Sequence, residues 1–154
     1  PALVTREPIA VEVGDGFVRL TRPETVRTAV DYPSIWSALE FNDINQPDIV
    51  EYYRDVGPEQ TYRWVFTWCA TEPVTREEIY ENIDVSFWVN GQEQTNILTY
   101  LVADCSGWMA LLSDWEPNTT VVLDIAFVIL HSTYDGTKTY VPGSYIHRIV
   151  VSVL

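Results

Sequence analysis

The side chains in this chain that are best suited to acid–base or metal chemistry are its two histidines, His131 and His147. They lie in different predicted strands, and neither belongs to an HExxH or Cys-x-x-His pattern of the kind that marks a metal site. The sequence also contains no GxSxG nucleophile motif, no P-loop and no GxGxxG dinucleotide motif. We therefore predict two structural histidines, no catalytic residues, no cofactor and a chain that is not an enzyme.

Oxygen-bearing side chains gather at Asn42, Asp43, Asn45 and Asp48, within the stretch FNDINQPD. Carboxylate and amide oxygens of this kind ligate calcium. Their spacing does not match an EF-hand loop, and both residue types are common in turns because their side chains bond to the nearby backbone. Calcium binding is an open alternative here, and we predict no metal site.

The two cysteines, Cys69 and Cys105, are the candidates for a covalent cross-link. Their even number and their positions near strand ends predict one intramolecular disulfide, with the two Cα atoms about 4.4–6.8 Å apart. Such a bond requires an oxidising compartment. Two buried free thiols are the alternative, and the spacing of the cysteines does not fit a metal site.

Five aromatic residues in predicted loops or short irregular segments are the candidate binding residues. They are Trp36, Tyr52, Tyr53, Trp108 and Trp115. Rings outside a core offer contact area at little cost in entropy, and they commonly mark carbohydrate or protein contacts. The alternative is that these rings plug the ends of the folded domain.

The stretch TYRWVFTWCA, residues 61–70, is predicted to be the strand that organises the fold. With a period of two residues, one face carries Tyr62, Trp64, Phe66 and Trp68. Four rings with this spacing line one side of a strand and cannot line one side of a helix. Each ring can bury about 150–250 Å², so we predict that this face belongs to the core and that the strand is central in its sheet.

The rest of the chain is predicted to consist mainly of short strands separated by turns. Residues 1–22 are expected to form an extended arm or a hairpin, and residues 23–60 an irregular insertion with a short helix at 48–56. A capping-box pattern predicts a helical turn at 77–82. Further strands are predicted at 83–90, 95–103, 120–130 and 144–154, with the apolar 120–130 strand buried on both faces.

These elements predict a single all-β domain over residues 1–154, an antiparallel β-sandwich with one or two short helical turns. The last sixty-five residues or so also resemble immunoglobulin-like domains in the order of their strands and turns. The resemblance is carried by Asn90-Gly91, Gly107-Trp108, Pro117-Asn118, Asp135-Gly136 and Pro142-Gly143-Ser144-Tyr145. It implies an immunoglobulin-like architecture.

Charge and hydropathy restrict the possible partners. The 154 residues include 22 acidic and 9 basic side chains, for a net charge of −13. Such a surface repels phosphate backbones and anionic lipids, so we predict no nucleic-acid binding. No apolar run approaches the roughly 18 residues that a membrane span needs, so no membrane insertion is expected.

We therefore expect a non-enzymatic structural or interaction subunit of an extracellular surface or virion assembly. It would act through protein–protein contacts with copies of itself or with other assembly subunits, and it would be located outside cells, at a cell surface or in a virion. The alternative is a carbohydrate-binding module that uses exposed aromatic residues such as Trp36, Trp108 and Trp115.

Overall fold

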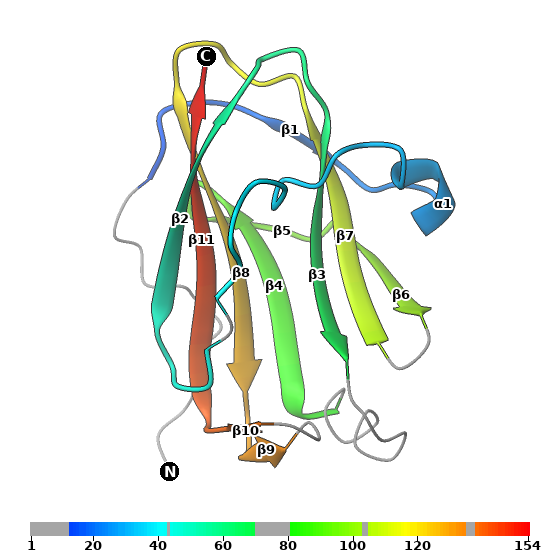
Figure 1. Ribbon diagram of the computed structural model, residues 1–154, viewed down its shortest axis with the longest axis vertical. Helices are drawn as coiled ribbons and strands as arrows, with labels where there is room; N and C mark the ends of the chain where they lie inside the picture. The colour runs from blue at the N-terminus through cyan, green and yellow to red at the C-terminus, as the bar shows by residue number, and fades with distance from the viewer. Residues whose placement is uncertain (1–12, 43, 70–80, 103–104, 135–137) are drawn as a thin grey trace.

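The computed structural model describes residues 13–42, 44–69, 81–102, 105–134 and 138–154. Two β-sheets face each other (Figure 1). Residues 1–12 of the expected arm or hairpin at 1–22, and most of the expected helical turn at 77–82, lie outside the described residues. None of the helices in the described part of the chain is long and apolar enough to cross a membrane.

The first sheet, sheet A, is built around β7 (Cys105–Ser113). The aromatic strand β3 (Tyr62–Cys69) pairs along one edge of β7, while β1 (Arg19–Thr21) and β6 (Leu98–Val102) share its other edge. The prediction that the aromatic strand is central in its sheet is therefore wrong, because β3 is an edge strand. Alternation of side chains reports which face of a strand is buried, and it carries no information about how many strands flank it.

The second sheet, sheet B, has the order β2–β11–β8–β4–β5. Its strands are β2 (Ile49–Val56), β11 (Gly143–Val153), β8 (Thr120–Ile129), β4 (Ile83–Val89) and β5 (Gln92–Gln94). Every neighbouring pair is antiparallel except β2 and β11, which run parallel. The all-β prediction is confirmed, but this sheet is mixed rather than purely antiparallel.

The short helix predicted at 48–56 is wrong, because this segment is the strand β2. Asp48 and Gly57 gave the stretch capping residues for a helix, but its interior is rich in β-branched and aromatic residues. Pairing of the whole length of β2 with Ile146–Val153 of β11 then decides in favour of a strand.

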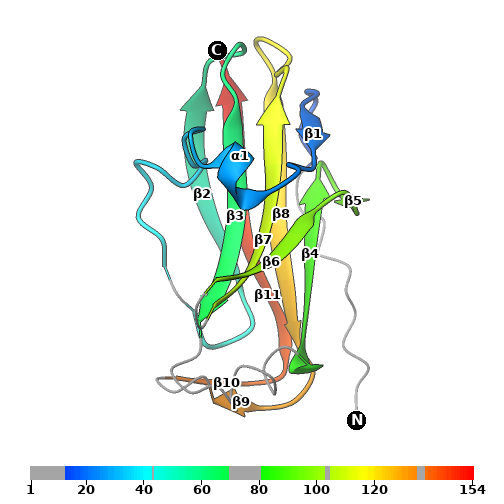
Figure 2. The same ribbon diagram turned by 90° about the vertical axis from the view of Figure 1, so that its right-hand side faces the viewer.

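The remaining elements are short. The helix α1 (Val26–Ala29) lies over the outer face of sheet A (Figure 2), and β9 (Thr133–Tyr134) pairs with β10 (Thr139–Tyr140). A reciprocal pair of hydrogen bonds between Thr25 and Thr28 begins the helix, with the Thr28 amide donating to the Thr25 hydroxyl at 3.2 Å. This capping box lies in the segment expected to be irregular.

The core lies between the two sheets and is unusually rich in rings. The predicted inward face of β3 is confirmed, since Tyr62, Trp64, Phe66 and Trp68 are all buried. On β4, in the strand predicted at 83–90, Phe87 is buried in the core cluster and its alternate neighbours Ile83, Val85 and Val89 pack against that cluster. The two inner faces therefore interdigitate as expected for a β-sandwich.

The outer face of β8, in the interior of sheet B, is also buried. On β8, Val122, Asp124, Ala126 and Val128 are nearly inaccessible to solvent although they point away from the core cluster. The prediction of a strand buried on both faces is thus confirmed. Arg148 on β11 lies opposite Asp124 in the ladder and donates two hydrogen bonds to its carboxylate, at 2.8 and 3.0 Å.

The disulfide between Cys69 and Cys105 is present, as predicted. The two residues face each other directly across β3 and β7, with their Cα atoms 4.0 Å apart, just below the expected range. Facing residues at non-hydrogen-bonded positions of an antiparallel ladder are the closest pairs that a sheet offers, at about 4.5 Å. The bond links neighbouring strands of one sheet, whereas in antibody domains the disulfide links the two sheets.

Candidate functional site

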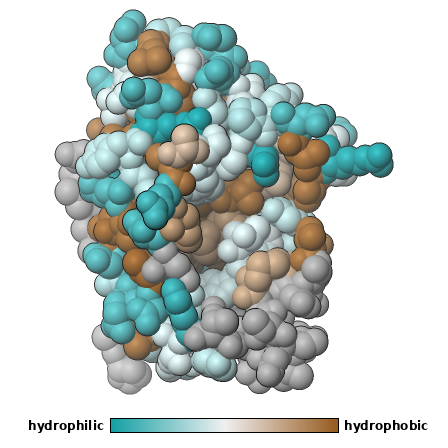
Figure 3. Space-filling model, viewed as in Figure 1, coloured by the Kyte–Doolittle hydropathy of each residue, from teal (hydrophilic) through white to brown (hydrophobic). Residues whose placement is uncertain are grey.

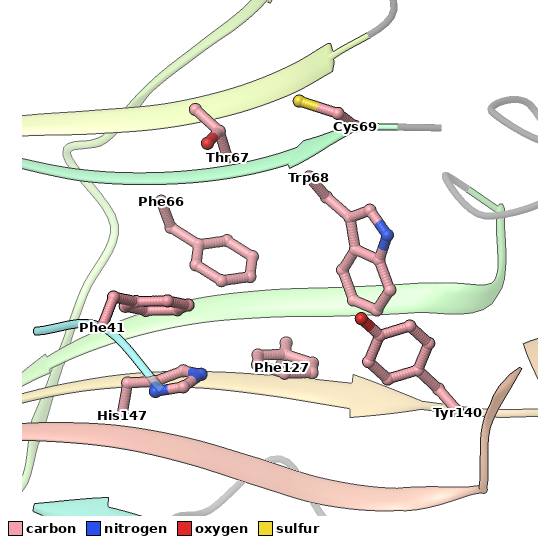
Figure 4. Close-up of a pocket in the computed structure, with 8 residues that line it drawn as sticks. All are labelled: Phe41, Phe66, Thr67, Trp68, Cys69, Phe127, Tyr140 and His147. Atoms are coloured by element: carbon pink, nitrogen blue, oxygen red, sulfur yellow. The ribbon is translucent and has the colours of Figure 1, made fainter. Parts of the chain in front are cut away.

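A cavity of about 280 Å³ lies between the two sheets at their open side. Figure 4 shows side chains from both sheets and from the connecting segments pointing into it. Its lining residues are Phe41, Phe66, Thr67, Trp68, Cys69, Phe127, Tyr140 and His147. In the space-filling view, hydrophobic atoms lie in a hollow on this side of the molecule (Figure 3).

Phe127 on β8 is the centre of the aromatic wall. Its ring is stacked on Phe66 at 5.2 Å and on Tyr145 at 4.8 Å, measured between ring centroids. Trp68 meets the Phe127 ring edge-on, with the ring centroids 5.3 Å apart. Trp68 also meets the ring of Tyr140 edge-on, at 4.7 Å. Because offset and edge-to-face ring pairs attract each other beyond simple burial, these contacts hold the wall in one arrangement.

Strand geometry explains why these side chains meet. Phe66 and Trp68 are two residues apart on β3, so both point to the inner face of sheet A. Tyr145 faces Phe127 directly in the β11–β8 ladder, and His147 follows two residues later on the same face. The cavity is therefore a product of register between strands that are far apart in the sequence.

Phe41 forms the outer rim of the cavity. Its side chain is 46% exposed, and its ring lies 4.6 Å from that of His147 and 5.4 Å from that of Trp36. The indole Nε1 of Trp36 donates a hydrogen bond of 2.8 Å to the carbonyl of Val65 on β3. Arg54 on β2 donates to the Ile35 carbonyl at 3.0 Å and so ties the same segment to sheet B.

His147 is buried in the cavity wall, with Nδ1 3.4 Å from the hydroxyl of Tyr52. That hydroxyl also accepts a hydrogen bond of 2.9 Å from the backbone N–H of Asn42. His131 lies elsewhere and is held through its backbone, which bonds to the side chain of Asn82. The two histidines are therefore not brought together, and each takes part in structural contacts.

The five aromatic candidates from the sequence do not form one surface. Trp36 and Tyr52 do meet, with ring centroids 5.2 Å apart beside Phe41. Tyr53 is 68% exposed, and on β2 it alternates with the buried Tyr52 to point the opposite way. Only Trp36 and Tyr52 of this set therefore lie near the mouth of the cavity.

Trp108 and Trp115 are buried in the core. Trp108 lies on β7 with its ring 5.7 Å from that of Phe66. Trp115 packs against Tyr62, and its Nε1 donates a hydrogen bond of 3.0 Å to the Gln60 carbonyl. Both rings therefore belong to the core cluster rather than to an exposed surface.

Most of the cavity lining was not selected from the sequence. Alternation did place Phe66 and Trp68 on an inner face, but it cannot show that this face ends at an open side. Phe127 lies in a nearly continuous apolar strand, where it does not stand out from its neighbours, and His147 was predicted only as a structural histidine. Phe41 lies beside the polar stretch that suggested calcium, and its aromatic type was the only available signal.

The lining of the cavity is mainly aromatic. No group of three or more His, Cys, Asp and Glu residues able to hold a metal ion occurs within the described ranges. Burial raises the pKa of Tyr145 behind the wall, while its hydrogen bond to the Val141 carbonyl acts in the opposite direction. Since drug-sized ligands need about 300–1,000 Å³, a space of 280 Å³ suits one ring-sized group.

No protein-family model matches this chain, and no curated protein sequence matches it. Its strands are similar to a solved structure of PbICP-C in complex with falcipain-2, with a TM-score of 0.44 and 8% sequence identity. The match covers 75% of this chain and 96% of the other. A likeness at this level carries no argument about function.

Proposed function

We propose that this chain is a non-enzymatic, immunoglobulin-like β-sandwich that acts through protein–protein contacts as a subunit of an extracellular surface or virion assembly. The observation that carries the proposal is the aromatic cavity, which opens at the side of the sandwich beside the half-exposed ring of Phe41. Buried pockets beside exposed rings are the usual energetic centres of protein interfaces. The partner is a copy of the chain or another assembly subunit.

The disulfide supports the extracellular part of the proposal. Bonds such as Cys69–Cys105 form and persist in oxidising compartments and are rare in the cytosol of most organisms. This bond borders the proposed contact site, because Cys69 is one of the residues that line the cavity. The disulfide therefore holds in place the same end of β3 that the partner would contact.

The carbohydrate-binding alternative has less support. Sugar recognition by aromatic residues needs rings that are open to solvent, and Trp108 and Trp115 are buried. Trp36 is half-buried between Phe41 and Tyr52. Tyr53 alone of the five candidates presents a largely exposed ring, and it lies on the opposite face of β2.

Light scattering of the full chain at 0.1 M and 1 M salt tests the proposal. We expect a native mass above the 17.6 kDa of one chain, rising with salt because salt screens the −13 charge. Phe41→Ser should lower this mass. Leu101→Ser is the matched control, since Leu101 is an exposed apolar residue on β6, which pairs with the other edge of β7.

Two outcomes of this experiment would contradict the proposal. A chain that remains a monomer from low to molar salt and binds a polysaccharide would contradict assembly and favour the carbohydrate-binding alternative. Equal effects of the Phe41 and Leu101 substitutions would show that association does not use the cavity.

A further inference from the structure

The outward edge of β3 carries backbone groups that point away from β7, and the first of them are already bonded by the preceding segment of the chain. The Arg63 amide donates to the Pro33 carbonyl and the Arg63 carbonyl accepts from the Ile35 amide, both at 2.9 Å. The carbonyl of Val65 accepts from Trp36 Nε1. Because backbone groups alternate in direction along an antiparallel ladder, the odd-numbered residues of β3 point their amides and carbonyls away from β7.

The chain itself already adds a short strand to this edge. Ser34 forms a parallel bridge with Arg63, next to the hydrogen bonds just described. The added segment then turns away at Trp36, whose side chain reaches the carbonyl of Val65. Thr67 is the next residue of β3 whose backbone amide and carbonyl point away from β7. No hydrogen bond joins its backbone to a described residue outside β7.

The open part of this edge is also one rim of the cavity. Phe66 and Trp68 point inward from β3, while Thr67 and Cys69 point to the other face (Figure 4). An added strand would place the residue opposite Phe66 or Trp68 on the same face as those rings. Its side chain would therefore be directed into the cavity.

We infer that the edge of β3 from Val65 to Cys69 docks an extended peptide segment of a partner protein, which adds as a strand and inserts one ring-bearing side chain into the aromatic cavity. This inference rests on the proposed function in protein–protein contacts and specifies how the contact is made. Main-chain hydrogen bonds give such a complex its affinity, and the pocket gives it selectivity.

The charge of the chain identifies the partner further. The net charge is −13, and the exposed Glu40 precedes Phe41 at the rim of the cavity. A segment with basic residues beside its ring residue is attracted by this surface at any salt concentration, whereas a second copy of the chain associates only as salt screens the like charge. The docked segment therefore belongs to a different, basic protein subunit.

Binding of a synthetic nonapeptide to the full chain tests the inference. The peptide alternates Thr and Val, with a central Phe and an Arg at each end, and binding is measured by isothermal titration calorimetry. We expect saturable binding that weakens about tenfold or more when the central Phe is replaced by Ala. Thr67→Pro should weaken it to a similar extent because it removes an outward amide, whereas the control Leu101→Ser, on β6 at the other edge of β7, should bind as the wild type does.

A second measurement does not depend on the folding of the Thr67→Pro variant. Two further peptides carry N-methyl groups on alternate residues, in the two possible sets. In a strand-added complex one set faces β3, so methylation of that set should block binding and methylation of the other should not. Equal binding of both methylated peptides, or equal binding after loss of the central Phe, would overturn the inference.

The outcomes separate this inference from the proposed function. A chain that self-associates through Phe41 but binds none of the peptides would overturn strand addition and leave the proposed function intact. A chain that remains a monomer in the light-scattering series but shows the expected peptide pattern supports strand addition with a different protein. Peptide binding that is unchanged when the two Arg residues become Glu would overturn the basic character of the partner.

Discussion

At the residue scale, the largest inaccessible side chain is that of Trp64 on β3. Its exposed fraction is 0%, and its ring meets Phe87 of the opposite sheet at 4.7 Å between centroids. Trp64→Ala would leave an apolar void between the sheets, so the free energy of unfolding should fall by about 3–5 kcal/mol. Urea unfolding checks this, with the exposed Leu101→Ala expected within about 0.5 kcal/mol of the wild type. A loss below about 1 kcal/mol for Trp64→Ala would contradict the assignment of this face to the core.

Gly107 on β7 allows a ring to lie directly on the backbone. A Cβ atom added at this position would overlap the ring of Tyr100 on the neighbouring strand β6. Gly107→Ala should therefore destabilise the fold by about 1–3 kcal/mol, because the ring must move. In a Tyr100→Ala background the same substitution should cost much less, and thermal unfolding of the four proteins in this cycle measures the difference. Equal losses in both backgrounds would show that the ring is not the cause.

At the element scale, the disulfide connects the ends of β3 and β7 and closes a long loop. The separation of 36 residues between Cys69 and Cys105 corresponds to about 3.8 kcal/mol of stabilisation in the chain-entropy account. The double variant Cys69→Ser/Cys105→Ser should lose up to this amount in urea unfolding, and wild type in reductant should behave alike. Alkylation of the unreduced protein must leave its mass unchanged. A mass increase would show free thiols and contradict the cross-link.

The pairing of β8 with β11 contains a buried ion pair, which gives a second prediction at this scale. Arg148 is 1% exposed and bonds to Asp124 through two nitrogens. Arg148→Met leaves the carboxylate buried without its partner, so a loss of about 3–5 kcal/mol is expected. Adding Asp124→Leu should recover most of that loss, because two apolar side chains replace the pair. A double variant as unstable as the single one would contradict this account.

The same elements show what the sequence could and could not predict. The inward rings of β3, the doubly buried β8 and the disulfide were all predicted, because each depends on local alternation or composition. Asn90 and Gly91 both have positive φ angles, 48° and 78°, as an Asn-Gly pair in a tight hairpin turn requires. The position of β3 at a sheet edge and the strand at β2 were missed, because both depend on which distant strand lies alongside.

At the scale of the whole molecule, the candidate site exists only because separate parts of the chain meet. Its walls come from β3, β8, β10 and β11, and its rim from the segment that contains Phe41. No single stretch of sequence contains the cavity, which explains why sequence analysis selected other aromatic residues. Sheet A ends at β3 on the side where sheet B ends at β2, and the residues around Trp36 partly cover the gap between these two edges.

The two pairings of β11 have a consequence for the response of the protein to mechanical force. Ten residue pairs join β11 to β8 and eight join it to β2, whereas β3 has a long ladder on one edge only. A pull along β11 loads its hydrogen bonds together, so we expect a single high-force rupture. A pull that peels β3 sideways breaks its bonds in succession at lower force. Optical-tweezer measurements along these two directions would compare the forces, and equal rupture forces would contradict this expectation. Under load, the cavity should therefore open by loss of its β3 wall while Phe127 and His147 stay in place.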